Sequence, residues 1–446
     1  MTKTTDIPYA KLEIIERPLS EIRPDPDNPR IHGKRHVRQI MGSIEAFGFN
    51  APILLDDSLQ IIAGHGRYAA AVHLGLQTVP TICLGHLDAR QRKAYMVADN
   101  RLGDLSKWDG KILAGIMLEL AEADLTFNVE AAGFSVGEID LMVAEQEEGT
   151  SDKDDALPEP GPIISAPGEV WELGDHVIIC GSALDASSYA AVLGNDMADV
   201  VLTDPPYNVP INGHVSGLGK VRHAEFEQAS GEMSEEEFIA FLTGSVSLSA
   251  RFSRDGSLQY WAMDWRHQHE LNVAARGVYD EQVNLCIWVK TNAGMGALYR
   301  SQHELFQVWR KGRERHRNNV QLGRFGRSRS NIWKYPGANM AGHGAGEGNL
   351  LHLHPTVKPV ALVADAVLDS TCRGEIVLDP FLGSGSTLIA AEKVGRRCRG
   401  IELAPAYVDT IIRRWQRWSG GLAQRRGDGA LFDDLEAAVA SAEGEA

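Results

Sequence analysis

A short apolar stretch that stops at two consecutive prolines places the strongest constraint on the fold of this chain. Val200, Val201 and Leu202 predict a buried strand, because β-branched and apolar residues favour that position. Asp204-Pro205-Pro206-Tyr207 follows. Proline cannot donate to a sheet and fixes φ at about −65°, so the chain leaves the strand in one rigid direction. We therefore expect a carboxylate and a phenol on a stiff turn at the carboxyl end of a strand, where open α/β sheets bind ligands.

A second predicted strand ends in a glycine turn farther along the chain. Residues 376–378 are apolar, and Asp379-Pro380-Phe381 leads from them into Gly383-Ser384-Gly385. Glycine lets the backbone approach a ligand closely, and the helix predicted from Ser386 or Thr387 offers N–H groups at its start. This segment therefore predicts a ligand-binding loop between a strand and a helix.

An acidic residue follows this loop at a spacing typical of nucleotide binding. Glu402 ends the next predicted strand, 19 positions after Gly383, and a carboxylate about 20 residues beyond such a glycine can reach ribose hydroxyls. Upstream, strands at 177–180 and 200–202 flank a helix around 187–193. This strand–helix–strand order is one half of a doubly wound α/β sheet.

Three motifs resemble those of the β-class DNA amino methyltransferases, which methylate adenine N6 or cytosine N4. They are the Asp-Pro-Pro-Tyr turn, the Asp-Pro-Phe-Leu-Gly-Ser-Gly-Ser-Thr segment at 379–387 and the His-Pro-Thr-Val-Lys-Pro segment at 354–359. Their order is the circularly permuted arrangement of that class, over roughly residues 170–418. The resemblance implies a Rossmann-like doubly wound methyltransferase sheet at 170–427, with a target-recognition insertion at 209–350, and S-adenosylmethionine (SAM) as cofactor.

The same resemblance implies the residues of the site. It implies a catalytic group formed by Asp204, Pro205, Pro206 and Tyr207. It implies cofactor-binding residues at Asp185, Thr356, Lys358, Asp379, Pro380, Phe381, Gly383, Ser384, Gly385, Ser386, Thr387 and Glu402. Within that group, Thr356 and Lys358 suit the SAM carboxylate and Glu402 suits the ribose.

The expected substrate is a base in duplex DNA. Asp204 and the Pro205 carbonyl would accept the hydrogens of an exocyclic amine, and the Tyr207 ring would stack on the base, which must be flipped out of the duplex. Asp before Pro-Pro-Tyr favours adenine N6, and cytosine N4 stays open as the alternative. A more remote alternative is a non-catalytic DNA-binding regulator that acts through its N-terminal domain.

The N-terminal part resembles the ParB/sulfiredoxin-like domains, an α+β module that we assign to residues 1–106. The resemblance rests on the strand, glycine turn and Ala-rich helix at 61–71, where Gly64-His65-Gly66-Arg67 replaces the usual Gly-Glu-Arg-Arg. That replacement favours an accessory that handles DNA or protein over a nuclease or nucleotide hydrolase. A helical appendix at 107–147 with Ile112, Ile116 and Leu120 on one face follows, and then an acidic, Pro-rich linker at 148–169.

Charge patterning locates the expected DNA contact. The formal net charge is −16, so contact with nucleic acid requires a local basic stretch. Residues 310–334 hold nine Lys and Arg against one acid, and basic side chains neutralise phosphates while aromatic rings stack on bases. The expected DNA-binding residues are Arg313, Arg315, Arg317, Arg324, Arg327, Arg329 and Trp333. The acidic segment at 428–446 is expected to be a mobile tail.

The remaining features exclude several classes of protein. Five scattered cysteines without a C-x-x-C pair predict a reducing, cytoplasmic environment and no zinc site, and the histidines show no metal-ligand spacing. No apolar run is long enough to span a membrane. The resemblance leaves a homodimer open, because such methyltransferases often dimerise.

Overall fold

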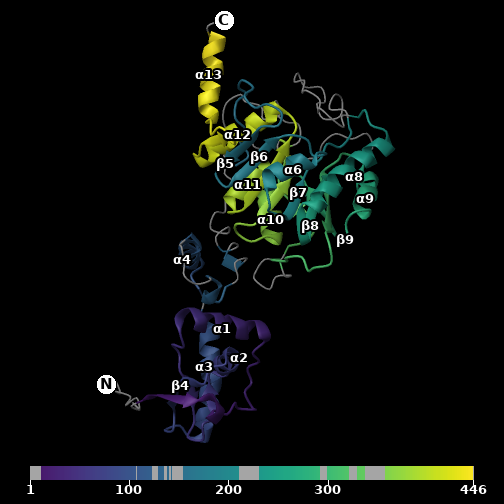
Figure 1. Cartoon of the computed structure of the whole chain (residues 1–446). Coiled ribbons are helices and arrows are strands. Elements are labelled where there is room, and N and C mark those ends of the chain that lie inside the picture. The colour runs from purple at the N-terminus through teal and green to yellow at the C-terminus, as the bar shows by residue number, and fades with distance from the viewer. Residues whose placement is uncertain are drawn as a thin grey trace, which may run out of the picture. The chain divides into compact units, whose positions relative to one another are not determined.

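The computed structural model describes residues 12–106, 108–122, 129–134, 138–139, 142, 154–209, 231–291, 299–320, 329–336 and 357–444 (Figure 1). Thr356, Arg324 and Arg327, and the glycine-rich residues 342–348, lie outside this part of the chain. Contacts between residues divide the chain into two compact units, Met1–Glu147 and Glu148–Ala446.

The first unit is built on a four-stranded sheet with the strand order β1-β4-β2-β3. β2 pairs in parallel with β4, and the other two pairings are antiparallel. Helices α1 and α2 contact each other. The elements are β1 (Ile14–Pro18), η1 (Leu19–Glu21), α1 (Lys34–Phe47), β2 (Ile53–Leu55), β3 (Ile61–Ala63), α2 (His65–Leu74), β4 (Thr78–Cys83), α3 (Ala89–Leu105), α4 (Gly110–Glu122) and η2 (Val129–Ala132). This mixture confirms the predicted α+β module.

Helix α4 confirms the predicted apolar face only at Leu120, which packs partly buried against the neighbouring cluster. Leu113 and Met117 are buried together with Ile139, whereas Ile112 and Ile116 are exposed. The helix carries apolar residues on adjacent stripes, so periodicity alone could not select the buried one.

The second unit contains a ten-stranded sheet with the order β11-β9-β10-β8-β7-β12-β13-β6-β5-β14. The five neighbours from β8 to β6 run parallel, which confirms the doubly wound sheet. The elements are β5 (Val170–Leu173), β6 (His176–Cys180), α6 (Ala186–Leu193), β7 (Ala198–Thr203), α8 (Glu235–Arg251), β8 (Ser253–Met263), α9 (Gln268–Arg276), β9 (Glu281–Val289), β10 (His303–Arg310), β11 (Ile332–Lys334), α10 (Val360–Ser370), β12 (Ile376–Asp379), α11 (Ser386–Lys393), β13 (Arg397–Glu402), α12 (Pro405–Ser419), β14 (Ala423–Arg425) and α13 (Phe432–Gly444).

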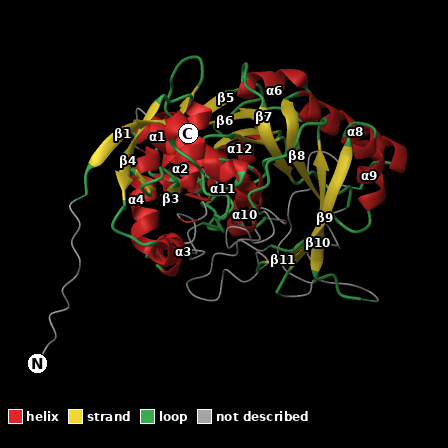
Figure 2. Ribbon diagram, turned by 90° about the horizontal axis from the view of Figure 1, so that it is seen from below, coloured by secondary structure: helices red, strands yellow, loops and turns green. Residues whose placement is uncertain are grey.

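The strand order predicts a crevice at the centre of this sheet. After β7 the chain crosses to β8 on one side, and after β12 it crosses to β13 on the other side. β7 and β12 are neighbours, so the connections diverge above their carboxyl ends and leave room for a ligand there. Helices α6 and α8 pack on the sheet through one apolar cluster, while α10, α11 and α12 form a second group (Figure 2).

Two acidic segments are more ordered than the sequence predicts. In the segment predicted as a linker, Asp154 is buried and accepts hydrogen bonds from Lys393 Nζ (2.7 Å) and Trp418 Nε1 (3.0 Å). In the segment predicted as a mobile tail, residues 432–444 form α13, and the buried Phe432 packs edge-on against Trp171. Both predictions rested on charge density, which does not register basic and aromatic partners that lie far along the chain.

Candidate active site

The turn after β7 holds Asp204 and Tyr207 at the edge of the central crevice. β7 is buried almost throughout, and the turn leaves it directly after Thr203. Asn208 has a φ of 52°, a left-handed conformation that residues other than glycine seldom adopt. Its side-chain oxygen accepts from the N–H groups of Gly231 and Met233, which fixes the end of the turn.

Lys358 connects the two functional groups of this turn. Its Nζ lies 2.5 Å from Asp204 Oδ2 and 3.2 Å from the Tyr207 hydroxyl, and Tyr207 itself donates to Asp204 Oδ1 at 2.5 Å. The lysine is only 6 % exposed. Sequence analysis assigned Lys358 to the cofactor, but its ammonium is engaged by the catalytic turn. The assignment of Lys358 to the SAM carboxylate stays a prediction, and its contacts with Asp204 and Tyr207 add a second role to it.

A second carboxylate, Glu304 of β10, completes the group. It accepts from Lys358 Nζ at 2.9 Å and from Lys290 Nζ at 2.5 Å. With Asp204, two carboxylates face two ammonium groups, so the charges of this partly buried group balance. Sequence analysis missed Glu304 and Lys290. The available signal was an acid on the buried face of an otherwise apolar strand, where Glu304 alternates with Phe306 and Val308.

Burial and charge shift the pKa values of these groups in different directions. Burial by itself raises the pKa of Glu304, but Lys358 and Lys290 outweigh it and hold that pKa at about 2. Burial and the charge of Glu304 raise the pKa of Asp204 in spite of Lys358. Burial disfavours the charged Lys358, but Asp204 and Glu304 prevail and raise its pKa. Lys358 therefore remains a cation at neutral pH.

Asp379 joins the two central strands. It is 3 % exposed and accepts from Thr203 Oγ1 and Thr387 Oγ1, both at 2.6 Å, and from the Phe381 N–H at 3.1 Å. These bonds tie the end of β7, the end of β12 and the start of α11 together. Burial raises the pKa of Asp379 to about 6.

The glycine loop adopts the backbone that its sequence predicts. Gly383 and Gly385 have φ angles of 56° and 84°, and a Cβ at Gly385 would meet Ile411 at 3.2 Å. Glu402 holds the loop in place, because its carboxylate accepts from the N–H groups of Gly383 (2.8 Å) and Ala404 (2.9 Å). Burial raises the pKa of Glu402 to about 7.

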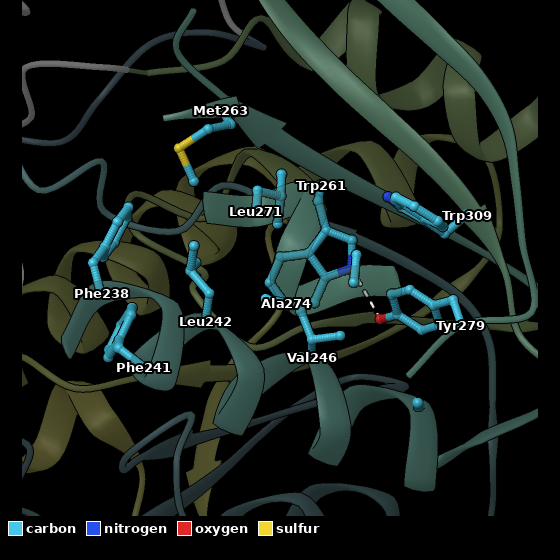
Figure 3. Packing of buried hydrophobic residues seen from close by; sticks show 12 residues of the cluster. Phe238, Phe241, Leu242, Val246, Trp261, Met263, Leu271, Ala274, Tyr279 and Trp309 are labelled. Atoms are coloured by element: carbon cyan, nitrogen blue, oxygen red, sulfur yellow. Dashed lines mark hydrogen bonds between the residues drawn. The ribbon is translucent and has the colours of Figure 1, made fainter. Parts of the chain in front are cut away.

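An aromatic wall lies beside the turn. Phe238, Phe241 and Trp261 belong to a buried cluster formed by α8, β8 and α9, in which Trp261 donates to the Tyr279 hydroxyl at 3.0 Å (Figure 3). Tyr207 and Phe381 pack against this cluster. One apolar core thus supports a ring from the catalytic turn and a ring from the loop.

Other predicted cofactor residues have internal roles. Asp185 is exposed and caps α6 by accepting from the Ser187 N–H at 2.9 Å. Buried Arg414 donates to the Ser384 carbonyl at 2.8 Å and approaches the Ser386 hydroxyl at 3.3 Å. Pro380 is buried at the end of β12. Asp185 therefore caps a helix in this structure, and its predicted contact with the cofactor adenine stays a prediction.

Two of the predicted DNA-binding residues lie inside the fold. Arg329 is 16 % exposed and pairs with Asp365 (2.6 Å) and Asp369 (3.1 Å) of α10. Trp333 is 5 % exposed, and its ring packs near those of Tyr260 and Phe306. The burial of both side chains argues against these two predictions, because composition alone does not separate surface charge and rings from those that hold elements together.

The arginines that directly follow β10 lie at the far edge of the sheet. β10 is antiparallel to β8 and ends with Arg310 opposite Leu258, well before the end of β8. Arg313, Arg315 and Arg317 follow β10, and Arg317 pairs with Glu375 just before the start of β12 (2.6 Å). These arginines are exposed at the amino ends of the parallel strands. The catalytic turn lies at the carboxyl ends, so the predicted link between this run and the site is not supported.

Family models match three parts of the chain. Residues 198–413 match the family described as DNA methylase, residues 3–100 match the ParB N-terminal domain, and residues 111–167 match the ParB-methyltransferase HTH domain. The last match spans most of the predicted appendix and linker.

Individual proteins resemble either the N-terminal part or the C-terminal part of the chain. The ParB-like nuclease domain-containing protein YnaK of Escherichia coli (strain K12) is 43 % identical over 83 residues, 19 % of this chain and 95 % of YnaK. Type II methyltransferase M2.DpnII of Streptococcus pneumoniae is 24 % identical over 242 residues, 52 % of this chain and 87 % of the relative. The crystal structure of the M1.HpyAVI–SAM complex has a TM-score of 0.38 at 19 % identity and covers 53 % of this chain and 98 % of its own.

The described residues contain neither a candidate metal site nor a candidate membrane span. Within them, no group of three or more His, Cys, Asp or Glu side chains is arranged to hold a metal ion. No helix among them is long and apolar enough to cross a membrane.

Proposed function

The chain belongs to the N6/N4 DNA methylases and carries a ParB-like N-terminal domain, and from this we propose that it methylates the N6 amine of adenine in duplex DNA, using SAM. One observation carries the proposal. The Asp204–Tyr207 turn and the Gly383–Gly385 loop adjoin the same crevice, joined through Asp379.

The residues of the loop fit SAM. The left-handed glycines shape a tight turn before α11, and no described side chain caps the start of that helix. Glu402 uses its oxygens for two backbone N–H groups, and a carboxylate has further lone pairs for ribose hydroxyls. Phe381 offers a ring for the adenine. Bound SAM would supply an electrophilic methyl sulfonium.

The catalytic turn fits an exocyclic amine. Asp204 and the Pro205 carbonyl would accept the two amino hydrogens, and Tyr207 would stack on the base. Lys358 holds one oxygen of Asp204 and thereby fixes the orientation of the carboxylate. Most of the rate enhancement would come from positioning, since well-oriented groups react far faster than free ones. The raised pKa of Asp204 suits it to take the proton that the nitrogen loses after methylation.

The experiment uses the full chain, unmethylated duplex DNA and SAM labelled in its methyl group, followed by nucleoside analysis of the product. We expect the label in N6-methyladenine. Label in N4-methylcytosine would show that the target base is cytosine and not adenine. No transfer by folded, SAM-binding protein would favour the non-catalytic regulator.

A further inference from the structure

The turn after β8 leaves the sheet beside the catalytic turn. β7 and β8 pair in parallel, with Thr203 opposite Trp261. Asp204 follows the first of these residues directly, and β8 ends two residues after the second. The segment Asp264-Trp265-Arg266 therefore starts at the same carboxyl edge as Asp204. This segment therefore lies next to the catalytic turn at that edge.

This turn is rigid, and it exposes a large ring. Asp264 Oδ1 accepts from the N–H groups of Arg266 and His267, both at 3.1 Å, and Gln268 Nε2 donates to the Met263 carbonyl at 2.9 Å. Trp265 is nevertheless 57 % exposed, with the Arg266 guanidinium 5.0 Å from its ring centre. Six other tryptophans of this unit are at most 5 % exposed: Trp171, Trp261, Trp288, Trp309, Trp333 and Trp415.

A second exposed ring lies toward the same edge. β10 runs antiparallel to β8, with Leu305 opposite Met263, so the start of β10 lies beside the end of β8. Tyr299 precedes β10 and is 84 % exposed. The carboxyl edge of these strands thus carries two solvent-exposed aromatic rings. The opposite edge carries Arg313 and Arg315.

We propose that Trp265 and Arg266 hold duplex DNA against the catalytic turn. The ring stacks on a base at the gap that the flipped target leaves. The half-exposed guanidinium, which pairs with Asp264 Oδ2 at 2.8 Å, turns its remaining N–H groups to a neighbouring phosphate. Planar rings fill gaps in a duplex and stack on any base, and arginine neutralises phosphate. The proposal rests on the proposed function, because it takes duplex DNA with an extruded base as the substrate.

The test measures DNA binding separately from catalysis. Full-length Trp265→Ala, Trp265→Phe and Arg266→Ala are compared with wild type for binding to a short, fluorescein-labelled, unmethylated duplex, across a series of salt concentrations. A control variant carries Arg313→Ala and Arg315→Ala at the far edge. SAM binding is measured in every variant to confirm that the crevice is intact.

We expect Trp265→Ala to raise the Kd for DNA about tenfold, as for loss of a stacked base, and Trp265→Phe to retain most of the affinity. Arg266→Ala should reduce the slope of log Kd against log salt by about one. The control should bind as wild type does. Unchanged binding by Trp265→Ala, or an equal loss in the control, would overturn the proposal. Absence of methyl transfer by wild type would contradict the proposed function, whereas the DNA-binding measurements would still show whether Trp265 and Arg266 contact DNA.

Discussion

Lys358 Nζ lies 2.5 Å from Asp204 Oδ2, and the lysine is almost fully buried. The residues are 154 positions apart, Asp204 directly after β7 and Lys358 just before α10. Without this cation Asp204 would keep the hydrogen bond from the Tyr207 hydroxyl but would face the charge of Glu304, and two nearby carboxylates disfavour each other's ionisation. The ammonium of Lys358 thus keeps Asp204 charged and fixed.

Lys358→Met tests this relationship. Removing one partner from a buried ion pair costs about 3–5 kcal/mol, so urea unfolding should show a loss of that order. Methyl transfer should fall at the same time, because Asp204 would protonate more readily. Lys334→Met, which removes an exposed lysine, is the control and should leave both unchanged. Full stability and activity of Lys358→Met would show that the pair is dispensable.

Gly385→Ala tests the backbone of the loop. The φ of 84° is strained for alanine, and the added Cβ would press on Ile411. The cost should be about 1–3 kcal/mol, and isothermal calorimetry should show weaker SAM binding. Gly420→Ala has a similar φ of 75° with open space around the Cβ, so it should lose some stability and retain SAM binding. Equal SAM binding by both variants would contradict the assignment of the loop.

Glu402 predicts a pH dependence. Burial raises its pKa from 4.5 to about 7. Between these two pH values the carboxyl is therefore more often protonated in the folded state than in the unfolded state. The free energy of unfolding should therefore fall as pH rises from about 4.5 to 7. Ribose hydroxyls prefer the ionised carboxylate, so SAM affinity should rise through the upper part of this window. Glu402→Gln should weaken both trends; identical profiles would exclude Glu402 as their source.

Phe432 tests the role of helix α13. Its side chain is fully buried against Trp171, and Phe→Ala substitutions in cores cost about 3–5 kcal/mol. Thermal unfolding of Phe432→Ala should show a clear decrease in Tm. Leu422→Ala, at an exposed leucine of the same region, should behave as wild type. An unchanged Tm for Phe432→Ala would support the mobile tail expected from the sequence.

The predictable features of this fold are local ones. The Asp204–Tyr207 turn, the Gly383–Gly385 loop and the strands before them follow from proline, glycine and apolar patterning within a few residues. Their meeting at one crevice was also predictable, because carboxyl ends of parallel strands share an edge.

The unpredicted features depend on distant partners. Glu304 reaches Tyr207 across 97 positions, through the pairing of β10 with β8. Arg329 is neutralised by two acids of α10 that no local pattern connects to it. Charge composition predicted a DNA-binding surface at Arg329. The three-dimensional structure instead pairs this arginine with Asp365 and Asp369.

Asp204→Ala tests the central claim most directly, since it removes the proposed amine acceptor and leaves the glycine loop untouched. Labelled methyl transfer to unmethylated duplex DNA and SAM binding are measured on the same folded preparation. The account predicts that transfer is lost while the Kd for SAM stays within about threefold of wild type, a difference of less than 1 kcal/mol. Continued transfer, or loss of SAM binding in a folded variant, would contradict it.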